Sequence, residues 1–342
     1  MNGPDADLAA CREGCGNATT QAIYKRFDAE LQRFGARGRQ VCRQDVDHHF
    51  ETLMAALSSN IAEVFVQYAL WLKDVLSSRG VPTTHLVFSF EAMSNYLQAQ
   101  LAEPTASRVR AILTLAQTAI TSHALPALFE PNRVPALEQT DRFQALILQG
   151  HNKPAMAVMQ AAMTDGLTLT QAAVRLVQPA LYRVGHLWQK SRISVSQEHL
   201  ATAVSQNILA GAYLQASFAP PVGKSAMFAC VEGGFHGVGL QILADAFDTA
   251  GWEVFNLGTN LPQRDLLRQI DAHRPNMLGL SISLPGQLAV ARETIEMMRA
   301  EMGSSCPEIW VGGLATMGVP QVTRLTKADA WAADALHALE QR

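Results

Sequence analysis

A histidine flanked by glycines is the first candidate for metal chemistry in this chain. Residues Glu232–Gly239 read Glu-Gly-Gly-Phe-His-Gly-Val-Gly, which places the histidine at position 236. A strand predicted over residues 225–231 comes directly before it, so His236 falls at the strand's carboxyl end, where α/β sheets bind ligands. Imidazole suits cobalt and similar transition metals, and neighbouring glycines let a bulky, flat ligand approach the backbone. The residues alone also fit an ordinary loop histidine.

Three further segments follow predicted strands. Gly258–Pro262 reads Gly-Thr-Asn-Leu-Pro, Leu280–Leu284 reads Leu-Ser-Ile-Ser-Leu, and Val311–Gly313 reads Val-Gly-Gly. Because the carboxyl ends of parallel strands meet at one edge of a sheet, we expect all four segments to line a single ligand site. Taken by itself, the Gly312-Gly313 pair also fits a tight turn.

In this order, the segments resemble the cobalamin-binding domain shared by methionine synthase, corrinoid methyltransferase proteins and B12-dependent light sensors. That family carries Asp-x-His-x-x-Gly, then Ser-x-Leu, then Gly-Gly, and the resemblance covers about residues 223–342. It implies that His236 is the lower axial ligand of cobalt and displaces the cofactor's own dimethylbenzimidazole base. The displaced nucleotide tail would run into the sheet, where Ser281 and Ser283 would line its slot and Gly312 and Gly313 would leave room. The other expected cofactor contacts are Gly234, Phe235, Gly237, Gly239 and Leu284.

One position departs from the family pattern. The family's aspartate, two residues before the histidine, is Gly234 here. Such a carboxylate normally accepts a hydrogen bond from the other imidazole nitrogen and tunes the basicity of the ligand. Glu232, a backbone carbonyl or water would have to take its place. The departure counts against a fast methyl-transfer cycle that switches the ligand by proton transfer.

A second helical segment resembles the four-helix cap of the adenosylcobalamin-dependent photoreceptor regulators. It contains Trp188 and, ten residues later, Glu198 and His199. The resemblance implies that Trp188 shields the cobalt–carbon bond and that Glu198 and His199 face the adenosyl pocket. Ser196 is the expected N-cap of the helix that carries them. On the residues alone, Trp188 also fits a core aromatic and Glu198 a solvated helix residue. Gln189 stands where some cobalamin light sensors place a histidine.

These motifs need three kinds of domain to position them. We expect an all-helical N-terminal domain of four to six helices over residues 1–130, with a frayed polar start over residues 1–20. A four-helix-bundle cap follows over residues 136–218. The last domain, 223–342, alternates strands and helices, which predicts a flavodoxin-like (Rossmann-like) α/β fold with a parallel sheet. Its predicted strands are 225–231, 253–257, 277–283 and 308–311, and its predicted helices are 237–250, 263–273 and 288–302.

The N-terminal domain shows no helix-turn-helix pattern and no basic recognition helix, so we expect no nucleic-acid partner. The layout of helical domain, cap and cobalamin domain resembles the photocobilins, which implies non-covalent biliverdin as a second chromophore. A bilin pocket needs aromatic walls, a basic partner for the propionates and a polar group near the pyrroles. Its candidates, each of which also fits a core or surface role, are Tyr68, Trp71, Phe88, Phe90, Tyr96, Arg79, Arg108, His48, His49 and His85.

Bulk composition narrows the function classes. Apolar residues make up 48% of the chain, which is enough for packed cores, and the formal net charge of −3 without charge blocks disfavours a nucleic-acid binder. Five cysteines and no signal peptide indicate the cytoplasm, and no apolar run indicates a membrane span. We expect a non-enzymatic light sensor that forms a light-dependent homo-oligomer and contacts an unknown downstream protein. The alternatives are a corrinoid methyl carrier and a light-independent cobalamin-binding regulator.

Overall fold

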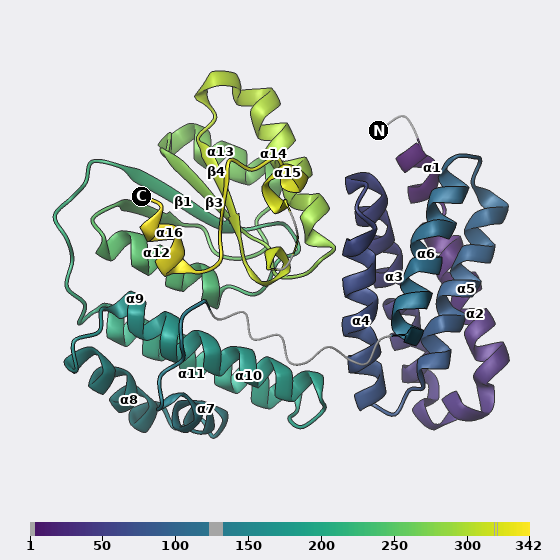
Figure 1. Ribbon diagram of the computed structural model, residues 1–342, viewed down its shortest axis with the longest axis horizontal. Coiled ribbons are helices and arrows are strands. Elements are labelled where there is room, and N and C mark those ends of the chain that lie inside the picture. Colours follow the sequence, from purple (N-terminus) through teal and green to yellow (C-terminus); the bar gives the residue numbers. More distant parts are fainter. Residues whose placement is uncertain (1–3, 123–132, 318, 320) are drawn as a thin grey trace. The chain divides into compact units, whose positions relative to one another are not determined.

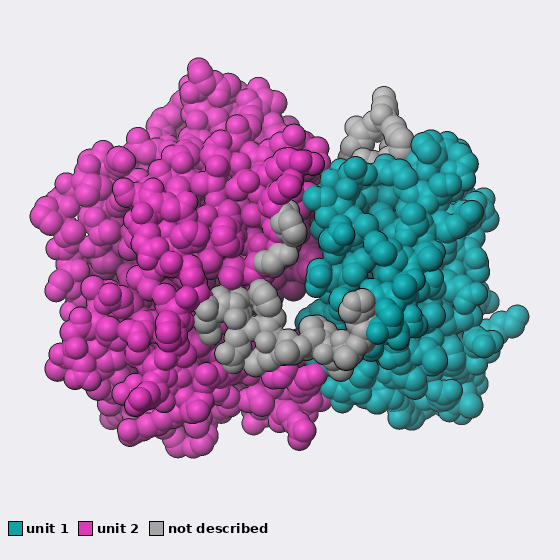
Figure 2. All heavy atoms as spheres, in the orientation of Figure 1, with its two compact units in different colours: residues 1–127 teal, residues 128–342 magenta. Residues whose placement is uncertain are grey.

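The computed structural model describes residues 4–122, 133–317, 319 and 321–342. The chain divides into two compact units, residues 1–127 and residues 128–342, which Figure 1 and Figure 2 distinguish. The boundary predicted at residue 130 falls between residues 122 and 133, outside the described residues. The predicted cap and α/β domain both belong to the second unit.

The first unit is entirely helical in its described part, as predicted. Its elements are α1 (Pro4–Ala10), α2 (Arg12–Leu31), the 3-10 turn η1 (Gln32–Phe34), α3 (Gly35–Ser59), α4 (Ala62–Ser78), α5 (Thr83–Gln100) and α6 (Thr105–Ser122). The expectation of a frayed start is wrong from residue 4 onward, because Cys15 and Thr19 of α2 are fully buried. The polar composition of this stretch hides a helix that packs along α5.

The predicted cap is a four-helix bundle at the start of the second unit. Its elements are α7 (Thr140–Leu148), α8 (Asn152–Thr164), α9 (Leu169–Ala172) running through the π-helical turn η2 (Ala173–Val177) into α10 (Gln178–Gln189), and α11 (Val195–Tyr213). The N-cap of α11 is Ser194, not Ser196 as expected. The Ser194 hydroxyl accepts from the Gln197 backbone N–H at 3.3 Å, and the Gln197 side chain accepts in return from the Ser194 backbone N–H. This reciprocal capping box outcompetes Ser196.

The α/β part carries a five-stranded, all-parallel sheet in the order β2-β1-β3-β4-β5. Its strands are β1 (Ser225–Cys230), β2 (Glu253–Asn256), β3 (Met277–Ser281), β4 (Glu308–Gly312) and β5 (Ala330–Ala332). Its helices are α12 (Val238–Thr249), α13 (Gln263–His273), α14 (Gln287–Met302), α15 (Val322–Thr326) and α16 (Ala335–Glu340), with the short turns η3 (Gly303–Ser305) and η4 (Leu314–Thr316). The predicted flavodoxin-like fold is confirmed. Strand β5 was missed because three residues give too short a pattern.

The cap packs against α12 and α16 of the α/β part. Helix α9 contacts both, helix α11 contacts α12, and Ile242, Ala246 and Ala335 join the hydrophobic core of the cap (Figure 1). A polar contact adds to this seam, since the Tyr213 hydroxyl of α11 donates to Asp248 of α12. Because the seam is mainly apolar, its burial stabilises the packing of the cap on α12 and α16. No helix in the described part of the chain is both long and apolar enough to cross a membrane.

Candidate functional site

The loop that carries His236 joins β1 to α12 at the carboxyl edge of the sheet, as predicted. His236 is exposed, and the neighbouring Phe235 is 70% exposed. The backbone beneath them is fixed by a second loop, because the Gly233 N–H donates to Asn260 Oδ1 at 2.9 Å and the Asn260 N–H donates to Gly234 O at 2.8 Å. The exposed imidazole therefore belongs to a loop whose backbone is held by a neighbouring loop.

Gln287, at the first position of α14, ties a third loop to the histidine loop. Gln287 is 7% exposed, and its side-chain Nε2 donates to Gly233 O at 2.9 Å. Its Oε1 accepts from the backbone N–H groups of Ser283 at 3.0 Å and Leu284 at 3.1 Å. Sequence reasoning missed both Gln287 and Asn260. The available signal was a side-chain amide in each loop that follows a strand, where it can satisfy loop backbone groups.

Gly234, which replaces the family aspartate, sits in a tight turn. Its N–H donates to Val231 O at 2.8 Å, and an added Cβ would lie 2.8 Å from that oxygen and 3.2 Å from Cys230 Cβ. An aspartate would thus require a backbone shift. Glu232 Oε2 accepts instead from the Gln263 N–H at 3.4 Å. Within the described residues, the imidazole has no hydrogen-bond partner of its own.

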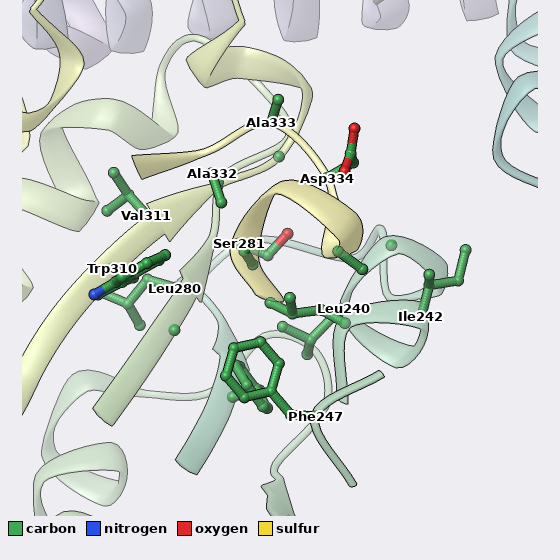
Figure 3. A pocket seen from close by; sticks show the side chains of 18 of the residues that line it. Leu240, Ile242, Phe247, Leu280, Ser281, Trp310, Val311, Ala332, Ala333 and Asp334 are labelled. Carbon is green, nitrogen blue, oxygen red and sulfur yellow. The ribbon is translucent and has the colours of Figure 1, made fainter. Parts of the chain in front are cut away.

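A slot lies between the sheet and helices α12 and α16, with a cavity volume of about 90 Å³ (Figure 3). Four predicted residues line it: Gly239, Ser281, Gly312 and Gly313. Ser283 and Leu284 do not line it and lie in the loop after β3. A Cβ at Gly312 would lie 2.9 Å from Ala332 O, and one at Gly313 would lie 2.5 Å from Ile282 O. Gly313 also has a φ of +97°, which favours glycine, so the backbone itself calls for glycine here. The predicted role of the two glycines in leaving room for a nucleotide tail stays a prediction.

Exposed apolar side chains stand in three of the loops at the carboxyl edge of the sheet. Phe235 follows β1, Leu284 follows β3 and Leu314 follows β4, with exposed fractions of 70%, 44% and 44%. Three large apolar groups from three loops at one sheet edge form a surface that water solvates poorly, and such surfaces commonly mark ligand sites. Leu314 was not among the predicted residues, although it directly follows the Gly-Gly pair.

The predicted cap residues gather at the turn between α10 and α11. Trp188 is half-buried in the last turn of α10, and Glu198 lies in the first turn of α11. The Glu198 carboxylate contacts Thr202 Oγ1 at 3.0 Å through Oε1 and His199 Nδ1 at 2.6 Å through Oε2. His199 is exposed. The structure thus brings the three residues to one end of the cap.

The bilin candidates of the first unit have partners within their own helices and core. His49 and Phe90 are buried, and His49 Nδ1 lies 2.8 Å from the Tyr68 hydroxyl. Burial lowers the pKa of His49 to about 3, so its imidazole is neutral at pH 7. His85 Nε2 contacts Glu30 at 2.8 Å, and Arg108 donates to Leu57 O at 2.7 Å. These contacts fit the structural reading of these residues, and the bilin site stays a prediction.

The residues at the sheet edge fit a corrinoid. An exposed imidazole offers one axial nitrogen, and the apolar loop tips suit the face of a macrocycle. The slot offers space for a flexible tail beside small residues. Sites of this kind, concave and mainly apolar with few polar groups, are typical of cofactor binding.

Comparisons with known proteins agree with this geometry. Residues 224–340 match the family described as B12 binding domain, and residues 139–211 match a second family of the same description. The chain is 29% identical over 169 residues to the HTH-type transcriptional repressor CarH of Myxococcus xanthus, covering 49% of this chain and 55% of the repressor. It is 31% identical over 83 residues to dimethylamine corrinoid protein 3 of Methanosarcina acetivorans, covering 24% of this chain and 39% of that protein. The chain thus spans about half, or less, of these relatives.

The structure of the monomethylamine corrinoid protein of Methanosarcina barkeri superposes with a TM-score of 0.50 at 15% identity. The match covers 60% of this chain and 96% of that protein, and it concerns the fold. The cap and the α/β part each match a family described as B12 binding domain, so the predicted fold and the resemblance to B12-dependent proteins are confirmed. The resemblance to the photocobilins stays a prediction.

Proposed function

From the B12 binding domains in both parts of the second unit, we propose that this chain is a light-sensing, adenosylcobalamin-dependent regulator. The observation that carries the proposal is His236 at the sheet edge whose slot Gly312 and Gly313 line. The similarity to the repressor CarH favours a regulatory role over an enzymatic one.

Each part of the site has a proposed task. His236 ligates cobalt from below, and Asn260 and Gln287 hold the backbone that presents it. Gly239, Ser281, Gly312 and Gly313 accept the nucleotide tail in the slot, while Phe235 and Leu284 lie against the macrocycle. When bound, adenosylcobalamin supplies a cobalt–carbon bond that visible light breaks.

The cap residues act on the upper side. Trp188 shields the upper ligand, and Glu198 exchanges its contacts with Thr202 and His199 for a ribose hydroxyl. Trp188 and Glu198 would make these contacts only while the upper ligand is present, and such a difference between two states is the requirement for a switch. The cap then repacks, and the changed surface alters self-association or the binding of a downstream protein. Gln189 leaves His199, His186 or water to occupy the vacated face.

A corrinoid methyl carrier is the second candidate. The similarity to dimethylamine corrinoid protein 3 favours it, whereas the tight turn at Gly234 leaves no room for the family aspartate without a backbone shift. A light-independent regulator is the third. Biliverdin as a second chromophore, the cytoplasmic location and the absence of a nucleic-acid partner remain predictions.

Irradiation of the holoprotein separates these functions. The full chain is purified in the dark with adenosylcobalamin, and its absorption spectrum and elution volume are recorded before and after green light. A persistent photoproduct with a changed elution volume is the expected result. An unchanged spectrum and elution volume, together with preferential retention of methylcobalamin, would support the carrier. A red absorbance band on adding biliverdin tests the second chromophore, and no band removes it.

The axial ligand is tested by His236→Ala. We expect weaker corrinoid retention and a shifted visible spectrum, because the imidazole nitrogen is lost from cobalt. His48→Ala is the matched control, since His48 is an exposed histidine of the first unit and should leave both readouts unchanged. A wild-type spectrum in His236→Ala would disprove the axial assignment.

A further inference from the structure

We propose that residues 133–139, here called the entry segment, hold the cap against α16 and are released as one piece when the cap and α16 separate. The entry segment is the first described stretch of the second unit, and it leads into α7 without a helix or strand of its own. It has one anchor on each side of the seam between the cap and the α/β part. The release half of the proposal rests on the proposed function, because that function requires the cap to move.

The first anchor lies on α16. Arg133 Nη2 donates to Glu340 Oε1 at 2.8 Å, and Arg133 Nε lies 3.6 Å from Asp334 Oδ2. The Asp334 side chain is 1% exposed, and its Oδ1 accepts from the His337 N–H at 2.8 Å as the N-cap of α16. Among the described residues, Asp334 Oδ2 has no hydrogen-bond partner. Arg133 therefore supplies a positive charge that this buried carboxylate needs.

The second anchor lies in the π-helical turn of the cap. Arg175 Nε donates to Pro135 O at 3.2 Å, and Arg175 O accepts from the Leu137 N–H at 2.9 Å. In a regular α-helix this carbonyl would accept from the N–H of residue 179, but residue 179 is proline and has no N–H. The entry segment thus supplies a donor that the helix itself lacks. Val134 and Leu137 also pack on the hydrophobic core of the cap.

The two anchors belong to different elements, so the entry segment responds to the distance between them. Because only four residues separate Arg133 from Leu137, a cap that moves away from α16 pulls on both anchors. Loss of the first anchor leaves the Asp334 carboxylate buried beside no positive charge from Arg133, which disfavours a half-detached segment. The entry segment therefore has two states, held and released. The position of the cap in this way affects the described stretch of the second unit that is nearest in sequence to the first unit.

Hydrogen–deuterium exchange of the full chain in the dark tests whether the entry segment is held in this way. The probe is the Leu137 amide, which lies at the second anchor, four residues from Arg133. Arg133→Gln should speed its exchange about tenfold, the effect of losing one charged hydrogen-bonding partner. Arg142→Gln, at an exposed position of the adjoining helix α7, is the matched control and should leave the exchange unchanged. Wild-type exchange of Leu137 in Arg133→Gln overturns the proposal.

Asp334→Asn separates the ion pair from a general loosening of the cap. Asparagine keeps the N-cap of α16 but carries no charge. In this background Arg133→Gln should speed Leu137 exchange less than about twofold, because the remaining contact with Glu340 is exposed and contributes little. A tenfold effect in both backgrounds would show that the buried carboxylate is not the partner, and the first anchor would be wrong.

Release is tested on the full chain loaded with adenosylcobalamin in the dark. After green light, Leu137 of the wild type should exchange about tenfold faster, whereas Arg133→Gln should respond less because its entry segment is already loosened. A photoproduct with unchanged Leu137 exchange overturns the release. If no photoproduct forms, the proposed function and the release are refuted together, whereas the dark measurements still decide whether the entry segment holds the cap.

Discussion

At the residue scale, the buried side chain of Gln287 links the loop after β1 to the loop after β3. Its donor reaches Gly233 and its acceptor receives two N–H groups from the loop after β3. Because Gly233 lies three residues before His236, we expect the amide to act as a positioning group for the imidazole. The residue touches neither the slot nor the exposed edge, so its effect must pass through the loop.

Gln287→Glu should separate this role from packing. The carboxylate keeps the acceptor for Ser283 and Leu284 but removes the donor to Gly233 and places like partial charges together. We expect cobalamin affinity to fall by about tenfold, the loss of one hydrogen bond to a buried carbonyl. The pH at which histidine leaves cobalt, followed in the visible spectrum, should rise. Gln341→Glu, at the exposed C-terminal end, is the control. An unchanged detachment pH would leave Gln287 a purely structural residue.

Gly234→Asp offers a second residue-scale prediction. Restoring the family aspartate should lower cobalamin retention, because the added Cβ would come within 2.8 Å of the Val231 carbonyl and shift the loop. Retention after gel filtration in the dark, compared with that of wild type, is the measurement. Tighter retention, accompanied by a new partner for the imidazole, would show that the loop adapts at little cost.

At the element scale, the seam between α11 and α12 carries an acidic pair. Burial, with a smaller contribution from the nearby Asp248 charge, raises the pKa of Asp245 to about 6. Tyr213 of α11 faces the pair and donates to Asp248. A folded-state pKa above the unfolded value means that the folded protein holds this proton more tightly. The resulting stability is full below about pH 4 and is lost as pH rises through about 6.

Asp245→Asn should remove that loss. At pH 7 the variant should be more stable than wild type by about 1 kcal/mol, after allowance for solvent screening, and the difference should shrink at pH 4. The free energy of unfolding of the second unit, measured by denaturant titration at both pH values, checks this. Asp271→Asn on α13 is the control, because its carboxylate is exposed. Parallel pH curves for Asp245→Asn and wild type would contradict the assignment.

Elements with a strong local pattern were predictable from the sequence. Helix α13 has the predicted bounds of 263–273, and the four predicted strands fall within two residues of the observed ones. Three features were not predictable, because each depends on tertiary partners. They are the fifth strand, the buried start of α2, and the contacts of Asn260 and Gln287. The small residues that line the slot were predictable through the resemblance. Its apolar lining was not, because it can be recognised only once α12 is placed against the sheet.

At the scale of the whole molecule, two units with separate cores should unfold separately. Calorimetry of the full chain should show two transitions, of which only the one from residues 128–342 rises with cobalamin. At 100 times Kd, binding adds about 2.7 kcal/mol to the unit that binds. Tyr68→Phe, which removes the hydroxyl that pairs with His49, should lower the other transition only. A single transition that shifts as a whole would mean that the units unfold cooperatively.

The π-helical turn at residues 173–177 determines the direction in which each later side chain of α10 points around the helix axis. A wide turn holds one residue more than an α-helical turn, and each residue advances the helix by about 100°. This applies to Tyr182 at the slot and to Trp188 at the far end of α10. Deleting a single residue here would turn both side chains by more than a quarter revolution while leaving the helix intact. The orientation of both side chains in the cap thus depends on one extra residue in this turn.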